Sequence, residues 1–519
     1  MTFSPSPAPP PPRSPAVGLG RLRAHPDALA LTLILGVALF FRGQFVFRAP
    51  MFMQHDSLGY FLPAFDLATG QGFGVGFRRT PVYPLFLSGV LITMGVNLTG
   101  ILIVKHLLGA VTAGLTYWLG RVTFGRLVGL VSGLLVAING ALIVGEHYLM
   151  SEGLFIPLLA LSLLALIGAG RADRAWRFLL AGLLLALTAL CRPIAQALFP
   201  LVPLGLLLLG LRLRQVVRGT VLVAFGVLAL LVPWTLRNCL TAGECSTTGV
   251  MGQAMLARTA YYDHGFVFYD ENDPERGPNA PRPAIRASIQ RASRQNFSGG
   301  VIVRRLQDDF KWSDAETARI AREMALDVIR RQPVYYLTGS VQMFWQIFNG
   351  EPERLRDDWK TQGRRASRDE WGDRLGYLLS SPTPQQEAEF GRAEAVINVW
   401  QPAFWAPWLP LLSLVGLSSA LLSRGPARAA ALLGLASLML MLVAAAFDGP
   451  VPRYRYPADP YIAILAAGGG LMLGRLAWPA VRRFRRPLTR DVGALRGAPS
   501  IPGAAGRGAA GRAPTARGL

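Results

Sequence analysis

Two carboxylates beside apolar runs are the residues best suited to acid–base chemistry. Asp56 stands in HDSLGY (55–60), just after the first apolar run, and Glu152 stands in HYLMSEG (147–153), where a later run begins. Ionisable groups at membrane depth are costly, so they are usually functional or paired. Two acids on one side could divide base and positioning roles, or bind a divalent cation through oxygen ligands. The structural alternatives are a loop acid or helix N-cap for Asp56 and complementation of a helix dipole for Glu152.

Six arginines lie in the same kind of polar segment: Arg78, Arg79, Arg192, Arg237, Arg453 and Arg455. Guanidinium groups offer paired donors that match phosphate oxygens, so several converging at one interface would suit a phosphate at headgroup depth. Snorkelling beside interfacial Trp and Tyr explains any one of them, but it explains less well why they accompany both acids. His55, His147 and His264 show no ligand spacing, so zinc is not expected.

The composition is that of an integral membrane protein. Of the 519 residues, 51% are hydrophobic and 16% charged, with a mean hydropathy of +0.34; soluble domains carry about 25% charged residues. The formal net charge of +22 could suggest nucleic acid. The Lys and Arg are instead spread between apolar runs, as in cytoplasmic loops, so nucleic acid is not an expected partner.

Ten apolar runs are long enough to cross a bilayer, which needs about 20 residues per helix. They lie near 27–47, 100–120, 127–145, 153–170, 176–191, 193–211, 219–236, 400–422, 428–447 and 459–480. Two further segments, 81–96 and 333–349, compete with them. Counting 81–96 as a span would send the next three arginine clusters outside, against the positive-inside rule. We therefore expect an interfacial or re-entrant helix there.

The same rule assigns both termini to the cytoplasm, because the arginine clusters of the short loops then share one side. Asp56, Glu152 and the six arginines fall on the opposite side. We predict an all-α, multi-pass membrane protein, in contact with membrane lipid, with these residues on its extracytoplasmic side. Lys105 and His106, in the outer third of the second run, are expected to snorkel toward the headgroups.

Composition also divides the chain into parts: a disordered leader at 1–26, a transmembrane half at 27–236 with a first outer loop at 48–99, an extracytoplasmic lobe of short helices at 237–398, the last spans at 399–480 and a disordered basic tail at 481–519. Within the lobe, Ser313 and Glu316 have the spacing of a capping box and predict a helix that ends before Pro333. Cys239 and Cys245 lie close together outside the membrane. A disulfide and two free thiols both fit them.

Several short motifs, in this order and on one side, resemble the GT-C membrane glycosyltransferases: RRTPVYPL (78–85), SEGLF (151–155), CRP (191–193), PWTLRN (233–238) and RYRYP (453–457). Within these, the sequence is most similar to the bacterial branch related to protein O-mannosyltransferases and lipid A aminoarabinose transferases. The resemblance runs from about residue 28 to 480. It implies a GT-C bundle of about ten transmembrane helices, with interfacial helices in the first outer loop.

The resemblance also implies an enzyme that takes a sugar from a polyprenyl-phosphate carrier and transfers it, with inversion, to a glycan, lipid or protein acceptor. Asp56 would be the general base or orient the acceptor, and Glu152 matches the second outer-loop carboxylate. Many relatives have Asp-Glu in the first loop where this chain has Asp56 and Ser57, which leaves Glu152 as the partner acid. The donor phosphate and sugar would be bound by Arg78 or Arg79, Arg192, Arg237, Arg453, Arg455 and Tyr60. No cofactor is certain, and a divalent cation stays open.

Two other functions share this topology. A ligase of lipid-linked glycans would differ in donor size. A transporter or flippase should show paired halves, broken helices and polar groups near the bilayer midplane. Here the interiors of the runs are almost purely Leu, Ala, Val and Gly, and the ionisable groups sit at the ends, which favours a transferase.

Overall fold

The computed structural model describes residues 26–53, 56–74, 78–259, 299–350, 383–398, 408–449 and 451–484, and it is mostly helical there. Within these ranges the one isolated β-bridge pairs Phe52 with Tyr148. The chain divides into two compact units, Met1–Met472 and Leu473–Leu519, and every residue of the candidate site lies in the first. Most of the predicted leader and tail, and parts of the predicted lobe, lie outside the described residues.

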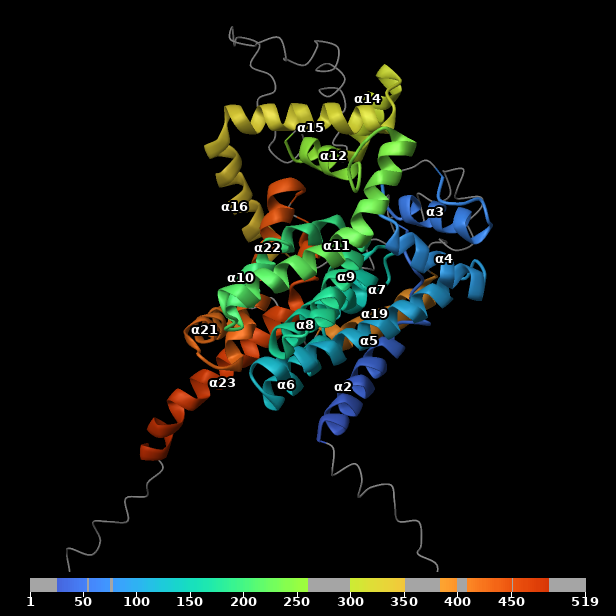
Figure 1. The fold of residues 1–519 in the computed structure, drawn as a ribbon. Coiled ribbons are helices and arrows are strands. Elements are labelled where there is room, and N and C mark those ends of the chain that lie inside the picture. Colours follow the sequence, from blue (N-terminus) through green and yellow to red (C-terminus); the bar gives the residue numbers. More distant parts are fainter. Residues whose placement is uncertain are drawn as a thin grey trace, which may run out of the picture. The chain divides into compact units, whose positions relative to one another are not determined.

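The described α-helices are α2 (Pro26–Gly43), α3 (Leu58–Ala68), α4 (Val82–Met94), α5 (Leu98–Thr123), α6 (Arg126–Ala137), α7 (Gly140–Glu146), α8 (Glu152–Ala172), α9 (Ala175–Cys191), α10 (Leu201–Leu208), α11 (Leu213–Ala242), α12 (Val250–Ala257), α14 (Gly299–Phe310), α15 (Asp314–Arg331), α16 (Pro333–Asn349), α19 (Pro384–Asn398), α21 (Trp408–Leu422), α22 (Ala430–Phe447) and α23 (Asp459–Phe484). Three short 3₁₀ helices accompany them: η1 (Pro193–Leu198), η4 (Pro426–Ala429) and η5 (Pro452–Arg455). Figure 1 labels most of the α-helices along the coloured chain.

Six described helices are long and apolar enough to cross a membrane, and all six coincide with predicted runs: α2, α5, α8, α11, η4 with α22 (Pro426–Phe447) and the first part of α23 (Asp459–Ala477). The run 127–145 becomes α6 and α7, bent by 51°. The bend has a local cause, because Asn139 caps α7 by accepting hydrogen bonds from the backbone N–H groups of Ala141 (3.0 Å) and Leu142 (3.3 Å).

The three other predicted runs are shorter helices. The run 176–191 is the 17-residue helix α9, and 400–422 is described only from Trp408, where α21 begins. The run 193–211 is not a single helix, since it divides into η1 and α10 around Pro200. Proline lacks the N–H that would continue the preceding helix, so the break follows from the sequence. Helix α4, in the segment predicted to be interfacial, is a 13-residue apolar helix.

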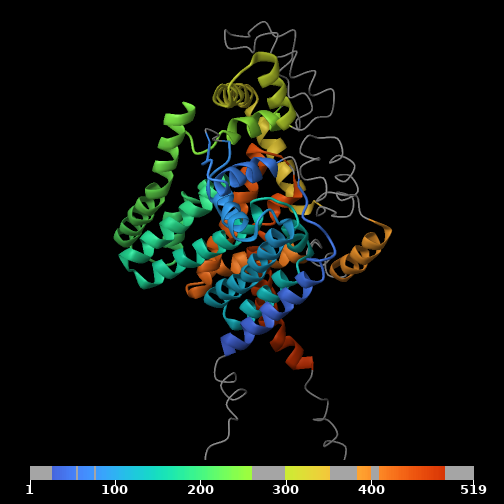
Figure 2. The same ribbon diagram turned by 90° about the vertical axis from the view of Figure 1, so that its right-hand side faces the viewer.

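Small residues allow the central helices to approach closely. A Cβ on Gly182 of α9 would lie 2.2 Å from the carbonyl oxygen of Val223 in α11, and one on Gly226 would lie 2.6 Å from that of Leu179. Such contacts are how membrane helices pack without a hydrophobic driving force. Helices α2 and α5 also lie side by side in both views (Figures 1 and 2).

The helices of the predicted lobe form a smaller group. Helices α12, α14 and α15 lie together, with α16 leading from them back to α22 (Figure 1). The predicted capping box is confirmed, since Ser313 Oγ accepts from Glu316 N (3.2 Å) and the Glu316 carboxylate accepts from Ser313 N (2.9 Å). Helix α15 ends at Arg331, before Pro333 as predicted. A disulfide joins Cys239 and Cys245.

Candidate functional site

Helix direction brings the two halves of the site together. Helices α8 and α9 are neighbours that run in opposite directions, so the start of α8 and the end of α9 share one end of the bundle. Glu152 opens α8, and Arg192 follows α9 in an extended conformation (φ −148°, ψ 118°) that a residue before proline favours. Their side chains form an ion pair in which Glu152 is 6% exposed. Arg192 also lies over the ring of Tyr454, 5.4 Å from its centroid.

Asp56 and Arg79 form the second ion pair of the site. Asp56 precedes α3, and Arg79 Nη2 donates to its Oδ1 at 2.6 Å. Arg79 also lies over the ring of Tyr60, 4.5 Å from the centroid, and its Nη1 donates to the Tyr60 hydroxyl at 3.3 Å. That hydroxyl is 3.4 Å from Ser151 Oγ, next to Glu152. The first outer loop is thereby connected to the start of α8.

Arg453 lies between the two pairs. It belongs to η5, in the connection from α22 to α23, and its guanidinium is 3.9 Å from Asp56 Oδ2 and 3.9 Å from Glu152 Oε1. Beside it, Tyr454 donates a hydrogen bond to Asp448, the residue that follows α22. We call Asp56, Arg79, Glu152, Arg192 and Arg453 the arginine–carboxylate cluster.

The cluster controls the ionisation of its outermost acid. Burial raises the pKa of Asp56, but the positive charges of Arg79 and Arg453 outweigh that effect and lower the pKa to about 2. Asp448 behaves in the opposite way, because burial raises its pKa and the hydrogen bond from Tyr454 offsets the rise only in part. The site therefore holds one strongly ionised carboxylate beside another whose ionisation is disfavoured.

Two predicted binding residues are engaged elsewhere. Arg455 is buried, and it donates to Asp459 Oδ1 (2.8 Å) and to the carbonyl of Phe348 (2.7 Å). Arg237 donates to the carbonyl of Gly74 in the Gly-rich loop and lies 5.0 Å from the centroid of the Trp234 ring. Neither makes a described contact with Asp56 or Glu152.

Arg78 lies at the edge of the cluster. Its charge contributes to lowering the pKa of Asp56, after those of Arg79 and Arg453. Its carbonyl accepts a hydrogen bond from Thr248 Oγ1 at 2.7 Å. Of the two adjacent arginines, Arg79 makes the described ion pair with Asp56.

A second group of charges lies deeper in the helices. Arg42, near the end of α2, donates to both carboxylate oxygens of Glu146 at 2.7–3.2 Å and to the carbonyl of Ala137 at 3.1 Å. His106 Nδ1 is 2.5 Å from Glu146 Oε2. Gly109 leaves room for this pair, since a Cβ there would lie 1.9 Å from Glu146 Oε1. We call Arg42, His106 and Glu146 the Arg42–Glu146 cluster.

Lys105 and His106 do not snorkel, so that prediction was wrong. Lys105 is fully buried and donates to the carbonyls of Tyr148 and Met150, and His106 pairs with Glu146. The turn after α7 supplies the carbonyl partners of Lys105, and Glu146, the last residue of α7, pairs with His106. These contacts also fix the chain just before Glu152.

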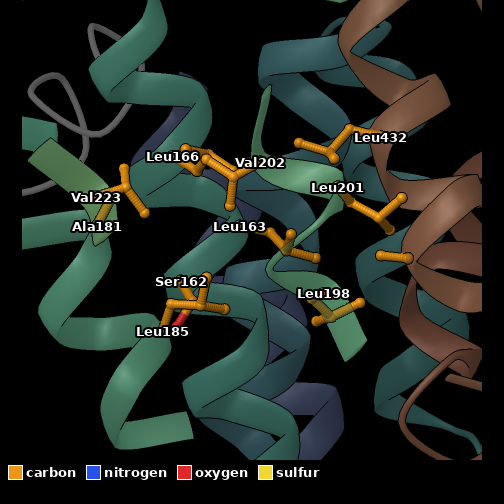
Figure 3. A pocket seen from close by; sticks show the side chains of 11 residues that line it. Ser162, Leu163, Leu166, Ala181, Leu185, Leu198, Leu201, Val202, Val223 and Leu432 are labelled. Atoms are coloured by element: carbon orange, nitrogen blue, oxygen red, sulfur yellow. The ribbon is translucent and has the colours of Figure 1, made fainter. Parts of the chain in front are cut away.

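Two small cavities lie among the helices. One, of about 10 Å³, is lined by Ser162 and by Leu, Val and Ala side chains of α8, α9, η1, α10, α11 and α22 (Figure 3). The Ser162 hydroxyl is hydrogen-bonded to that of Thr188. This cavity is apolar and barely large enough for one water, so it is a packing gap. The other, of about 20 Å³, touches Arg42, Glu146, Glu152 and Tyr456, where one water fits between polar groups.

The sequence prediction omits Asp448 and Tyr454. Tyr454 lies between two predicted arginines in RYRYP, which is a usable signal, but nothing around Asp448 marks it. Arg42 and Glu146 are 104 residues apart, and no local pattern pairs them. As to metals, no three His, Cys, Asp or Glu side chains among the described residues could hold an ion together.

Residues 78–236 match the model of a family described as dolichyl-phosphate-mannose-protein mannosyltransferase. The match contains Arg79, Glu152 and Arg192 of the cluster. This match is consistent with the predicted relationship to protein O-mannosyltransferases over these residues, which make up less than half of the chain. No curated protein sequence matches the chain.

Two solved structures are similar to the chain at low identity. The archaeal oligosaccharyltransferase AglB from Archaeoglobus fulgidus, in complex with an inhibitory peptide and a dolichol-phosphate, has 10% identity and a TM-score of 0.46, covering 90% of this chain and 52% of AglB. This chain therefore spans about half the length of AglB. ArnT from Cupriavidus metallidurans, bound to undecaprenyl phosphate, has 14% identity and a TM-score of 0.34, covering 88% of this chain and 80% of ArnT.

Proposed function

We propose that this protein transfers a sugar from a polyprenyl-phosphate-linked donor to an acceptor, with the arginine–carboxylate cluster as its active site. The observation that carries the proposal is the convergence of Arg79, Arg192 and Arg453 on Asp56 and Glu152. These residues come from four separate parts of the chain. The family match over 78–236 supports a lipid-phosphate donor.

The charge of the cluster suits a phosphodiester. Three guanidinium groups face two carboxylates, so one further anion balances them. Arg453 is 3.9 Å from both acids, beyond the usual length of an N–H···O hydrogen bond. A donor phosphate that replaced these long contacts with charge-assisted hydrogen bonds would bind between Arg192 and Arg453. Preorganised cations there would stabilise the charge that develops on the leaving phosphate.

Asp56 is the proposed general base, and its side chain is 40% exposed, so an acceptor hydroxyl can reach it. A pKa of about 2 makes it a weak base at neutral pH, because general bases work best near the operating pH. The donor phosphate changes that, because it draws Arg453 toward itself and away from Asp56. Asp56 then gains basicity only when the donor is bound.

The displacement takes place in one step. The acceptor hydroxyl oxygen forms a bond to the anomeric carbon, on the face opposite the carrier. The bond from that carbon to the carrier's phosphate oxygen breaks, and its electron pair stays on the phosphate. The hydroxyl proton passes to Asp56, and the sugar is inverted. Glu152, held by Arg192, orients that arginine and supplies the second negative charge of the site.

We place this site on the extracytoplasmic face of a bacterial inner membrane, with ten spans and both termini in the cytoplasm. The Cys239–Cys245 disulfide supports this orientation, since disulfides persist in oxidising compartments. A cysteine introduced in 146–152 should be labelled from outside in spheroplasts, and one in 172–175 should not. The reverse pattern would overturn the orientation.

Mass spectrometry of lipid-linked sugars and glycans tests the reaction. A deletion strain carrying Asp56→Asn should accumulate the donor lipid and lack the glycosylated product, whereas Asp66→Asn, which changes an acid in α3 outside the cluster, should restore both to normal. Normal product with Asp56→Asn would refute the catalytic assignment. Movement of the donor lipid across the membrane without any sugar transfer would support a flippase instead.

A further inference from the structure

Tyr454 contacts both arginines proposed to bind the donor phosphate. The guanidinium carbons of Arg192 and Arg453 lie 5.4 Å and 5.9 Å from the centroid of its ring. The ring is 9% exposed, so it is fixed by packing. The face of an aromatic ring carries negative electrostatic potential and attracts guanidinium groups at such distances.

The hydroxyl of Tyr454 ties the ring to the end of α22. It donates to Asp448, the residue directly after Phe447, where the helix ends. The chain between them belongs to the connection that carries Arg453. The hydrogen bond therefore closes this connection into a loop and limits rotation of the ring.

A spacing function follows from these contacts. The guanidinium groups of Arg192 and Arg453 repel each other, and each is also attracted by a carboxylate. Arg192 pairs with Glu152, while Arg453 lies 3.9 Å from both Glu152 and Asp56. Without a fixed surface in contact with both groups, Arg453 could close onto either acid. A ring in contact with both groups keeps them apart while still stabilising their charges.

We infer that Tyr454, tethered by Asp448, is a positioning residue that holds Arg192 and Arg453 at the separation needed to bind one phosphate group. The inference rests on the proposed function, since it concerns the donor phosphate. It assigns positioning roles to Tyr454 and Asp448, neither of which is proposed to contact the sugar acceptor. The ring acts on the arginines, and Asp448 acts through the ring.

Binding of undecaprenyl phosphate to the full-length protein in detergent, measured by calorimetry, tests this inference. Tyr454→Leu removes the ring and should weaken binding about tenfold, the effect of losing cation–π contacts to two arginines. Tyr454→Phe keeps the ring and loses the tether, and should weaken binding about threefold. Asp448→Ala removes the hydrogen-bond acceptor of Tyr454 and should weaken binding about threefold, as Tyr454→Phe does.

Tyr461→Phe is the matched control, because this buried tyrosine of α23 lies outside the cluster; it should bind normally. Wild-type affinity in Tyr454→Leu would overturn the inference and leave the proposed function standing. If Tyr454→Leu does not fold, Tyr454→Phe decides, and unchanged affinity there would overturn the tether. Failure of the wild-type protein to bind undecaprenyl phosphate would instead count against the proposed function. Unfolding temperatures of all variants separate weakened binding from weakened folding.

Discussion

The two groups of buried charge differ in balance and in exposure. In the Arg42–Glu146 cluster one arginine faces one carboxylate, both nearly inaccessible, with hydrogen bonds of 2.7–3.2 Å and further contacts to His106 and a backbone carbonyl. In the arginine–carboxylate cluster three cations share two acids, two contacts are 3.9 Å long, and Asp56 is 40% exposed. A balanced, enclosed pair fixes the chain, whereas three arginines beside two acids form a positively charged site that attracts an anion.

The largest expected effect comes from the Glu152–Arg192 pair of the arginine–carboxylate cluster. Glu152→Gln should reduce sugar transfer about 10²–10³-fold, because it removes the charge that orients Arg192 toward the leaving phosphate. The double variant Arg192→Met/Glu152→Met should be no more active, because both charges are used by the reaction. Product formation in membranes that contain the native donor lipid measures this. Recovery of activity in the double variant would mean that the pair is merely structural.

In the Arg42–Glu146 cluster, by contrast, removal of both charges should recover what removal of one charge loses. Glu146→Ala leaves a buried arginine unpaired and should destabilise the fold by about 3–5 kcal/mol. Arg42→Met/Glu146→Met removes both charges and should recover most of that loss, as apolar replacements of buried pairs often do. Thermal unfolding in detergent measures both. A double variant as unstable as the single one would show that the charges are needed for more than each other.

Arg453 and Arg455 of the RYRYP motif allow a residue of the site to be compared with a structural neighbour. Arg453→Lys loses the fork geometry toward phosphate and should weaken binding of undecaprenyl phosphate about tenfold, with little change in unfolding temperature. Arg455→Lys should lower the unfolding temperature and leave binding of undecaprenyl phosphate unchanged, because Arg455 donates hydrogen bonds to Asp459 and to the carbonyl of Phe348 inside the protein. The two variants are matched in sequence and chemistry. Equal loss of affinity in both would place Arg455 in the site as well.

The sequence predicts much of the fold because hydropathy and the positive-inside rule act over long stretches. All six helices able to span a membrane coincide with predicted runs. The breaks at Asn139 and Pro200 are local: a capping side chain and a proline shorten helices that average hydropathy treats as continuous. Those residues were visible, but a window of 20 residues averages them away.

The sequence indicated which residues could form the site, but not which of their side chains pair. The structure brings Asp56, Arg79, Glu152, Arg192 and Arg453 together, whereas their placement on one side of the membrane stays a prediction. The sequence cannot show that Arg453 turns to the acids while Arg455, two residues later in a 3₁₀ turn, pairs with Asp459. Nor does it show that Lys105 finds buried carbonyl partners more than 40 residues away.

The smallest expected effect is a pH dependence of stability at Asp56. Burial raises its pKa, but Arg79 and Arg453 lower it from 3.8 to about 2 in the folded state. A lowered folded pKa means that the ionised group stabilises the fold above pH 3.8 and loses that contribution as pH falls toward 2. Because the side chain is 40% exposed, solvent screening limits the contribution to about 1 kcal/mol.

Asp56→Asn should therefore lower the unfolding temperature slightly at pH 6, and the difference from wild type should shrink by about half at pH 3. Added salt should reduce it at pH 6, since exposed ion pairs are screened. Glu146→Gln serves as the contrast, because its enclosed pair should depend less on salt. A pH-independent difference at Asp56 would mean that the arginines do not hold its charge, and that its contact with Arg79 contributes to stability only as a hydrogen bond.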